Sequence, residues 1–249
     1  MTRKSIRTIV KQLGKATGWA AVRRSPRILW DHADSELRVD LDFVLAHYRQ
    51  SHSGVFCLQV GAYDGIAGDP IYPLAEKYGL RGVLVEPQRD AFEKLRTNYQ
   101  KFGDRFEIVN AAIAEKDGKV PLYRIQPGAT GPEWLPQLAS LHRETVLRHK
   151  LTVPNIEALM SVEEVPSLTF STLFKTMGIS HVDLLQVDTE GYDAEILRMF
   201  DLRTRRPPIV RFEHKHLSSE AHETCIRELI SLGYKLAMAE GDTLAYLLP

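Results

Sequence analysis

The sequence predicts an α/β protein built on a doubly wound, mostly parallel sheet that ends in an antiparallel hairpin. Three observations predict this class. Short apolar runs of strand length alternate with amphipathic helical stretches from about residue 54 onward, which is typical of right-handed βαβ crossovers. The runs are mainly apolar, as expected for parallel strands that are covered on both faces. The last two runs flank Gly241 and Asp242, a turn sequence that favours a hairpin.

Composition sets further limits on the class of protein. The 249 residues are 44% hydrophobic and 26% charged, as in ordinary soluble domains, and the formal net charge is +0. A neutral chain gives no electrostatic reason to expect a nucleic-acid partner. Cys57 and Cys225 lie too far apart for zinc-ligand spacing, so a reducing, cytoplasmic compartment is expected. No apolar run approaches the roughly 18 residues of a membrane span.

Residues 1–53 are predicted to form a helical extension that is basic at its start. Eight Lys and Arg residues precede the first acidic residue, Asp31. Apolar residues recur there at helical spacing, namely Ile6, Ile9, Val10 and Leu13. This amphipathic pattern leaves three surfaces open for the apolar stripe: the protein's own domain, an anionic membrane surface or a second subunit. A second helix is predicted at residues 35–50.

The first half of the sheet is predicted from three apolar runs and the helices between them. The strands are expected to end at Val60, to cover 82–88 and to cover 106–114. The helices are expected near 70–79 and at 89–103, where Phe92, Leu95 and Tyr99 recur at helical spacing. Ligands of such sheets bind beyond the carboxyl ends of the strands.

After the third strand the alternating pattern breaks down. Residues 118–125 suit an antiparallel strand, and residues 126–166 are rich in Gly and Pro, with one short helix expected at 141–150. Long insertions of this kind are usually lids or binding loops. We therefore expect a lid-like insertion at about 126–166 that contributes to acceptor specificity.

The core pattern then resumes up to the C-terminal hairpin. The elements expected are a helix at 171–178, a strand passing into a helix at 181–200, a strand at 207–216, a Ser-capped helix at 218–234 and two strands at 235–249.

Three strand ends together predict a nucleoside site. Gly61 to Gly65 follow the first strand, Glu86 follows the second and Asn110 the third. Glu86 lies 25 residues beyond Gly61, near the ~20-residue offset at which an acidic side chain accepts hydrogen bonds from ribose hydroxyls. The alternative is an ordinary turn, in which the glycines serve only the backbone.

The charges of the first loop indicate which cofactor it binds. A pyrophosphate needs a glycine-rich turn that leads into a helix N-terminus, and this chain has no such turn. The loop instead carries Tyr63, Asp64 and, a little later, Asp69. Carboxylates repel phosphate but suit the sulfonium and ammonium groups of S-adenosylmethionine. We expect a side chain placed at Gly61 to occupy the ligand's position.

Five segments, in this order and spacing, resemble the FkbM-type family of S-adenosylmethionine-dependent methyltransferases: LQVGAYDG, VEPQ, VNAAIA, LLQVDTEGYDAEIL and FEHKHL. The resemblance covers residues 54–249. It implies a seven-stranded, Rossmann-like methyltransferase domain that methylates hydroxyl oxygens of sugars, glycans or secondary metabolites. Gln59 and Tyr63 depart from the usual methyltransferase loop, where an acidic residue and a glycine are frequent, which affects the expected path of the loop.

The resemblance also implies a set of cofactor-binding residues. The methionine side would be bound by Gly61, Ala62, Tyr63, Asp64 and Gly65, the ribose by Glu86 with Pro87 beside it, and the adenine by Asn110, Ala111 and Ala112. Asp188 would position the cofactor or the acceptor.

Carboxylates and histidines at the ends of the fourth and fifth core strands indicate the chemistry. Asp188, Glu190, Glu213, His214 and His216 can converge over the transferable methyl group. We expect His214 to be the general base, with Asp188 positioning the acceptor and Glu213 supporting. Two alternatives stay open: His214 has a purely structural role, or Asp188, Glu213 and His214 bind a divalent cation that lowers the pKa of a diol.

The function expected is therefore an S-adenosylmethionine-dependent O-methyltransferase that acts on a small-molecule or glycan acceptor. Two other classes remain as alternatives: a non-catalytic module that binds a nucleoside cofactor, and a nicotinamide-dependent oxidoreductase. The second would require the phosphate-binding glycine turn that the chain lacks.

Overall fold

A seven-stranded sheet forms the centre of the protein. The computed structural model describes residues 39–239 and 241–247 of the chain. The predicted amphipathic helix around residues 6–13 and the first part of the helix predicted at 35–50 lie outside the described residues. The described part of the second helix is α3 (Leu41–Tyr48). It begins after Asp40, whose carboxylate accepts a hydrogen bond from the N–H of Phe43.

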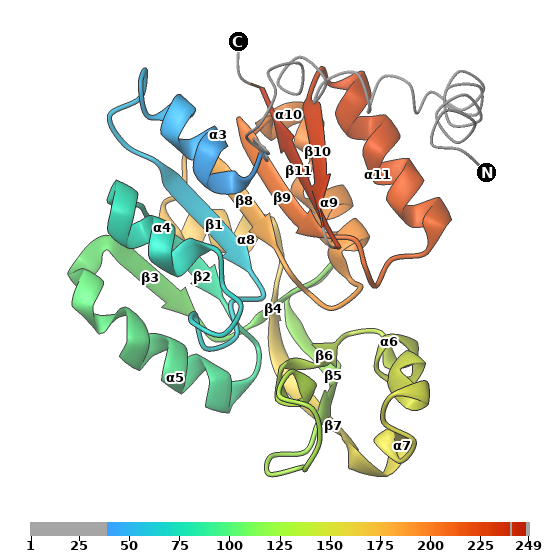
Figure 1. The fold of residues 1–249 in the computed structure, drawn as a ribbon. Helices are drawn as coiled ribbons and strands as arrows, with labels where there is room; N and C mark the ends of the chain where they lie inside the picture. The colour runs from blue at the N-terminus through green and yellow to red at the C-terminus, as the bar shows by residue number, and fades with distance from the viewer. Residues whose placement is uncertain (1–38, 240, 248–249) are drawn as a thin grey trace, which may run out of the picture.

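The main sheet has the strand order β10-β11-β9-β8-β1-β2-β3 (Figure 1). Its strands are β1 (Phe56–Val60), β2 (Arg81–Val85), β3 (Phe106–Val109), β8 (Leu184–Val187), β9 (Ile209–Glu213), β10 (Lys235–Ala239) and β11 (Asp242–Tyr246). All neighbouring pairs are parallel except the two that include β11. The predicted doubly wound, mostly parallel sheet with a terminal hairpin is confirmed.

Helices cover both faces of this sheet. One face packs on α3, α4 (Ile71–Tyr78) and α5 (Arg89–Tyr99). The other face packs on α8 (Phe170–Met177), α9 (Asp193–Phe200), α10 (Leu202–Arg205) and α11 (Ser219–Ser231). Successive side chains of a strand pack into the hydrophobic cores on opposite faces of the sheet, as Cys57 and Leu58 of β1 do. These strands are therefore apolar on both faces. No helix in the described part of the chain is long and apolar enough to cross a bilayer.

A second sheet, with the order β4-β7-β5-β6, lies beside the carboxyl ends of the main strands. It contains β4 (Ala112–Ile113), β5 (Gly118–Ile125), β6 (Ala139–Ser140) and β7 (Met160–Leu168). The prediction of one strand over 106–114 was wrong, because β3 ends at Val109 and β4 belongs to this second sheet. The chain leaves the main sheet at Asn110, a break that an apolar run alone does not reveal.

The segment at 126–166 is more ordered than its Gly and Pro content suggested. The short helix expected at 141–150 is α6 (Arg143–Leu147), which runs into the 3-10 turn η4 (Arg148–Leu151). The segment also holds η3 (Leu135–Gln137), α7 (Ile156–Leu159) and most of β7, and β7 pairs with all of β5. Another 3-10 turn, η2 (Gln100–Arg105), follows α5.

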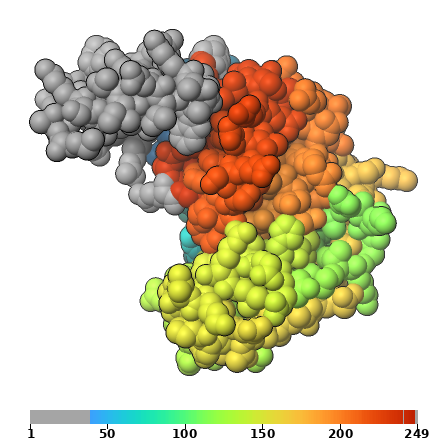
Figure 2. All heavy atoms as spheres, turned by 90° about the vertical axis from the view of Figure 1, so that its right-hand side faces the viewer, coloured from blue at the N-terminus to red at the C-terminus, as the bar shows by residue number. Residues whose placement is uncertain are grey.

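The second sheet and its helices have a small core of their own and are fastened to the main domain. The buried core residues are Ile125, Leu135, Leu138, Val146, Val153 and Ile156. Arg124 of β5 forms two hydrogen bonds of 2.8 Å with the carboxylate of Asp90 at the start of α5. Figure 2 shows the yellow-green residues of this unit packed against the orange and red C-terminal part of the chain.

Candidate active site

A pocket lies at the carboxyl ends of β1, β2 and β8, where α/β sheets of this kind bind ligands. It encloses about 810 Å³ of empty space including its open mouth. Eight of the residues predicted to bind cofactor line it: Gly61, Ala62, Tyr63, Glu86, Pro87, Ala111, Ala112 and Asp188. Ser140 and Leu141 of the 126–166 segment border the same pocket.

Gly61 is required by the packing of two strand exits. It has a φ of 82°, and its N–H donates to the carbonyl oxygen of Val85 at 2.9 Å. A Cβ at this position would lie 1.8 Å from the carbonyl oxygen of Asp188. A side chain at Gly61 would therefore meet the neighbouring backbone first, which corrects the expectation that it would only displace the ligand.

In the rest of the first loop, Ala62 and Tyr63 line the pocket, and Asp64 and Gly65 stabilise the turn. Tyr63 has a φ of 47°, which is unusual for a side chain other than Gly, and it lines the pocket. The carboxylate of Asp64 accepts hydrogen bonds from the N–H groups of Ile66 and Ala67, at 2.9 and 2.8 Å, and so closes the turn. A Cβ at Gly65 would lie 2.4 Å from the Leu95 side chain of α5. The pocket lining includes neither Asp64 nor Gly65.

Glu86 lies in the pocket wall with its carboxyl group held by the backbone. Its side chain accepts hydrogen bonds from the N–H of Tyr63 at 2.8 Å and from the N–H of Gln88 at 2.7 Å, one on each oxygen. Burial raises the pKa of Glu86 to about 7. Each oxygen has capacity for a further hydrogen bond, so the group can accept from two hydroxyls of one ligand.

Asn110 supports this part of the pocket from behind. Its side-chain amide donates to the carbonyl oxygens of Glu86 and Pro87, at 2.9 and 3.0 Å. Asn110 does not line the pocket, whereas the next two residues, Ala111 and Ala112, do. Asn110 therefore contacts the backbone of Glu86 and Pro87, and the apolar residues Ala111 and Ala112 line the pocket.

Unsatisfied polar atoms show that the pocket suits a ligand with several donors. The Oε1 atoms of Gln59 and Gln88 are buried without a hydrogen-bond partner among the described residues, and both side chains line the pocket. Gln59 donates through Nε2 to the carboxylate of Asp69 at 3.3 Å. Burial raises the pKa of Asp69 to about 7. Amino and hydroxyl groups of a bound nucleoside cofactor would satisfy such acceptors.

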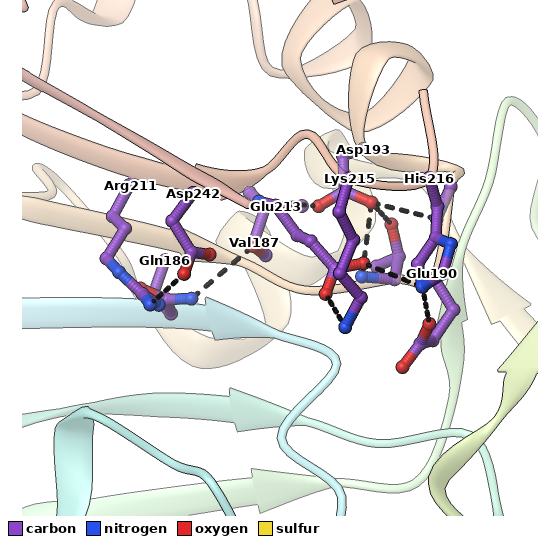
Figure 3. A network of polar contacts seen from close by, with 11 residues as sticks. Gln186, Val187, Glu190, Asp193, Arg211, Glu213, Lys215, His216 and Asp242 are labelled. Carbon is purple, nitrogen blue, oxygen red and sulfur yellow. Dashed lines mark hydrogen bonds and ion pairs between the residues drawn. The ribbon is translucent and has the colours of Figure 1, made fainter. Parts of the chain in front are cut away.

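A second group of polar residues gathers where β8 and β9 end (Figure 3). We call Glu190, Glu213 and His216, with Lys215 between the last two, the carboxylate–histidine cluster. Nε2 of His216 lies 2.8 Å from Oε2 of Glu190 and 3.7 Å from Oε2 of Glu213. Nζ of Lys215 lies 2.5 Å from Oε1 of Glu213. The three carboxylate and imidazole ligand atoms all lie within 4.8 Å of one another.

Asp193 holds the two strand ends of the cluster together. Its carboxylate accepts hydrogen bonds from the hydroxyl of Thr189 at 2.9 Å and from the N–H groups of Gly191 and Glu213, both at 3.2 Å. Asp193 is fully buried, and burial raises its pKa to about 7. The loop that carries Glu190 is thus fixed against the end of β9.

The pKa values of ionisable groups in and beside the cluster are strongly shifted. Burial raises the pKa of Asp188 well above its usual range, and the nearby Glu190 carboxylate adds to this. Burial and the Asp188 carboxylate raise the pKa of Glu213 to about 10. Burial opposes the charge of Lys215, but the carboxylates of Glu190 and Glu213 outweigh it and raise the pKa to about 12. Such clustering of shifted groups in a cleft is typical of a functional site.

The structure does not bring His214 into this group. Its Nδ1 lies 3.0 Å from the hydroxyl oxygen of Thr243, and its ring stacks on His222 with centroids 4.3 Å apart. The N–H groups of His214 and Lys215 both donate to the carbonyl oxygen of Gly241, at 2.6 and 3.0 Å. The chain therefore turns directly after β9, and His216 rather than His214 returns to the side of Glu213.

A second pocket lies on the far side of the cluster, between α6, α9 and the start of α11. Its lining includes the polar residues His142, Thr145, Arg148, Glu195, His216 and Ser218. Arg148 donates to the carbonyl oxygen of His216 at 2.8 Å. Glu190 lines the first pocket and His216 lines the second, so each pocket is bordered by one member of the cluster.

A seven-stranded sheet with one reversed strand and a pocket at its carboxyl edge defines a methyltransferase-type α/β protein. The chain belongs to the FkbM methyltransferase family, because the family model described as "Methyltransferase FkbM domain" matches residues 59–236. The resemblance inferred from the motifs is confirmed. S-adenosylmethionine is the usual methyl donor of such a family.

A solved structure has the same fold at low sequence identity. The methyltransferase FkbM from Methylobacillus flagellatus KT has 11% identity and a TM-score of 0.51, over 78% of this chain and 44% of that one. This chain thus spans less than half the length of that protein. The precorrin-6y C5,15-methyltransferase from Geobacter metallireducens GS-15 has 9% identity and a TM-score of 0.41, over 86% and 90% of the two chains. No curated protein matches the sequence.

Proposed function

We propose that the protein transfers a methyl group from S-adenosylmethionine to a hydroxyl oxygen of a sugar, glycan or secondary metabolite. The observation that carries the proposal is that Glu190 and His216, whose side chains approach to 2.8 Å, border two different pockets. One pocket has the features of a nucleoside site, and the other includes polar side chains that could hydrogen-bond to a hydroxyl-bearing acceptor. Proton-accepting groups stand at the boundary, where a methyl group would pass from one pocket to the other.

The first pocket binds the cofactor in this proposal. The two oxygens of Glu86 accept hydrogen bonds from the ribose hydroxyls, and Ala111 and Ala112 pack against the base. Gln59 and Asp69 provide acceptors for the ammonium group of the methionine part. S-adenosylmethionine supplies an electrophilic methyl group on a sulfonium centre. The protein's own contribution is to bind and orient it, since alignment for in-line displacement is a large part of such catalysis.

The acceptor reaches the cluster through the second pocket. Its hydroxyl must lose a proton as the oxygen attacks, and the predicted base was His214. The contacts of His214 with Thr243 and His222 favour giving that role to the cluster. His216 lines the second pocket, and its Nε2 lies 2.8 Å from Oε2 of Glu190. Ser140 and Leu141 border the first pocket, which supports the view that the 126–166 insertion covers the site and contributes to acceptor specificity.

Two measurements test the proposal. Calorimetric titration with S-adenosylhomocysteine and with NAD should give binding of the first only. Incubation with methyl-¹³C-labelled S-adenosylmethionine and a panel of sugars, nucleotide sugars and polyhydroxylated metabolites should give a product whose labelled carbon has the NMR shift of an O-methyl group. NAD binding without S-adenosylhomocysteine binding would overturn the cofactor assignment. An N-methyl or C-methyl product would overturn the assignment of oxygen as the acceptor atom.

A third result would support a different function. Binding of S-adenosylhomocysteine without turnover on any acceptor, including whole metabolite extracts, would favour the non-catalytic module. The FkbM family match makes an enzyme the stronger expectation.

A further inference from the structure

We infer that Glu190, Glu213 and His216 form a binding site for a divalent first-row metal ion. The predicted cation site used Asp188, Glu213 and His214, and the structure brings together a different set of ligands. The binding of the ion does not depend on the proposed function. Its role in activating an acceptor hydroxyl does rest on that function.

The spacing of the three ligand atoms suits one small ion. Nε2 of His216 lies 2.8 Å from Oε2 of Glu190 and 3.7 Å from Oε2 of Glu213, and all three atoms lie within 4.8 Å of one another. An ion about 2.1 Å from each ligand in a tetrahedral arrangement would hold them about 3.4 Å apart. The observed distances lie on either side of that value, so small movements of the side chains would complete the site.

Two buried carboxylate oxygens in the cluster have no hydrogen-bond partner in the described part of the chain. They are Oε2 of Glu190 and Oε2 of Glu213. Glu213 is only 4% exposed, so water cannot readily satisfy its oxygen. His216 lies close to both atoms, but the contacts do not have hydrogen-bond geometry. A buried acceptor without a partner costs free energy, and a metal ion between these atoms would remove that cost.

The contacts around the cluster hold the ligands in a form ready to bind. Lys215 occupies Oε1 of Glu213 at 2.5 Å, which fixes the carboxylate and leaves Oε2 directed at His216. Glu190 has a φ of 49°, a left-handed conformation that side chains rarely adopt. Asp193 holds this loop through the Thr189 hydroxyl and the N–H of Gly191. A strained residue kept in place by buried hydrogen bonds is typical of a functional site.

Charge and donor type indicate the class of ion. The two carboxylates would bind the ion in their ionised form and the imidazole in its neutral form. Two carboxylates with one imidazole suit Mn²⁺, Fe²⁺ or Zn²⁺ better than Ca²⁺, which prefers an all-oxygen set. Because Glu190 lines the cofactor pocket and His216 the acceptor pocket, the ion would contact an acceptor hydroxyl and lower its pKa.

The test measures metal binding without turnover. The full chain, freed of metal with a chelator that is then removed, is titrated with Mn²⁺ alone, followed by electron paramagnetic resonance, and with Zn²⁺ alone by calorimetry. We expect one site per chain. Glu190→Gln and His216→Ala should each weaken it by at least about tenfold, since even ligand-supporting residues typically have effects of 10- to 100-fold. The matched controls are Glu195→Gln and His142→Ala, a pair whose side chains lie 3.9 Å apart and which no third potential ligand joins among the described residues. They should leave the affinity unchanged.

The same samples separate failure of this inference from failure of the proposed function. S-adenosylhomocysteine binding is measured on each variant to show that it is folded, and His216→Gln replaces any variant that is not. A wild-type chain that binds S-adenosylhomocysteine but neither Mn²⁺ nor Zn²⁺ overturns the metal site and leaves the proposed function intact. If the control variants weaken metal binding as much as Glu190→Gln and His216→Ala do, the assignment of the ligands is overturned.

Discussion

Replacing Glu86 with Gln tests the cofactor site while keeping the shape of the side chain. The carboxylate accepts the N–H of Tyr63 on one oxygen and the N–H of Gln88 on the other, at 2.8 and 2.7 Å. A Gln side chain has one acceptor oxygen and one NH₂ donor. In either orientation, therefore, one backbone N–H would face another donor, and one of the proposed ribose hydroxyls would lose its acceptor.

The magnitude follows from these two losses. One stranded buried N–H lowers the free energy of unfolding by about 1–3 kcal/mol, which corresponds to roughly 2–12 °C in Tm for a chain of this size. Loss of a charged acceptor for the ribose weakens cofactor binding by about 1–3 kcal/mol, a change of about 5- to 150-fold in Kd.

Calorimetry with S-adenosylhomocysteine and a thermal unfolding curve measure the two effects separately. Glu107→Gln is the control, because Glu107 is an exposed carboxylate on the neighbouring strand β3. A Glu86→Gln variant that loses Tm but keeps its affinity for S-adenosylhomocysteine would show that Glu86 only holds the loop. That result would refute the assignment of the ribose site.

Three further predictions follow from the same contacts. Burial raises the pKa of Asp69 from 3.8 to about 7, so between these pH values the native state binds more protons than the unfolded state. The free energy of unfolding therefore falls as the pH rises from about 4 to about 7, by up to about 1.4 kcal/mol per pH unit. Asp69→Asn should reduce this pH dependence in a series of urea denaturation curves, and an unchanged pH dependence would contradict the shifted pKa. Gly61→Ala should lower the free energy of unfolding by about 1–3 kcal/mol or more, because its Cβ would lie 1.8 Å from the Asp188 carbonyl oxygen; weakened cofactor binding at full stability would restore the original expectation for this glycine. Once an acceptor is known, His216→Ala should lower turnover by about 10²- to 10⁴-fold and His214→Ala by far less, and the reverse order would return the role of base to His214.

The strand and helix pattern of the main sheet could be predicted because it depends on local sequence. Buried parallel strands need apolar residues on both faces, so FCLQV and LLQV stand out against the amphipathic helices around them. The same rule gave the position of the pocket, since the strand ends of a doubly wound sheet lie at a common edge. Glu86 was found in this way, one residue beyond β2.

Of the second sheet, only β5 was predicted, as the antiparallel strand at 118–125. Its assembly into a separate sheet could not be predicted, because the other strands depend on distant partners. β7 is only half-buried, and its partner β5 lies more than thirty residues earlier in the chain. Asn110 suited an adenine contact at a strand end, but the break between β3 and β4 turns its amide toward the carbonyl oxygens of Glu86 and Pro87. The pattern of the sequence holds no information on that direction.

The sequence by itself determined the class of fold, the family, and which strand ends carry polar residues. Only the tertiary structure decided which of those side chains meet. The sequence FEHKHL favoured His214 as the base. The structure turns the chain after β9, where the carbonyl oxygen of Gly241 accepts hydrogen bonds from the N–H groups of both His214 and Lys215. Side-chain direction beyond a strand end is fixed by such long-range hydrogen bonds, and local propensity does not encode them.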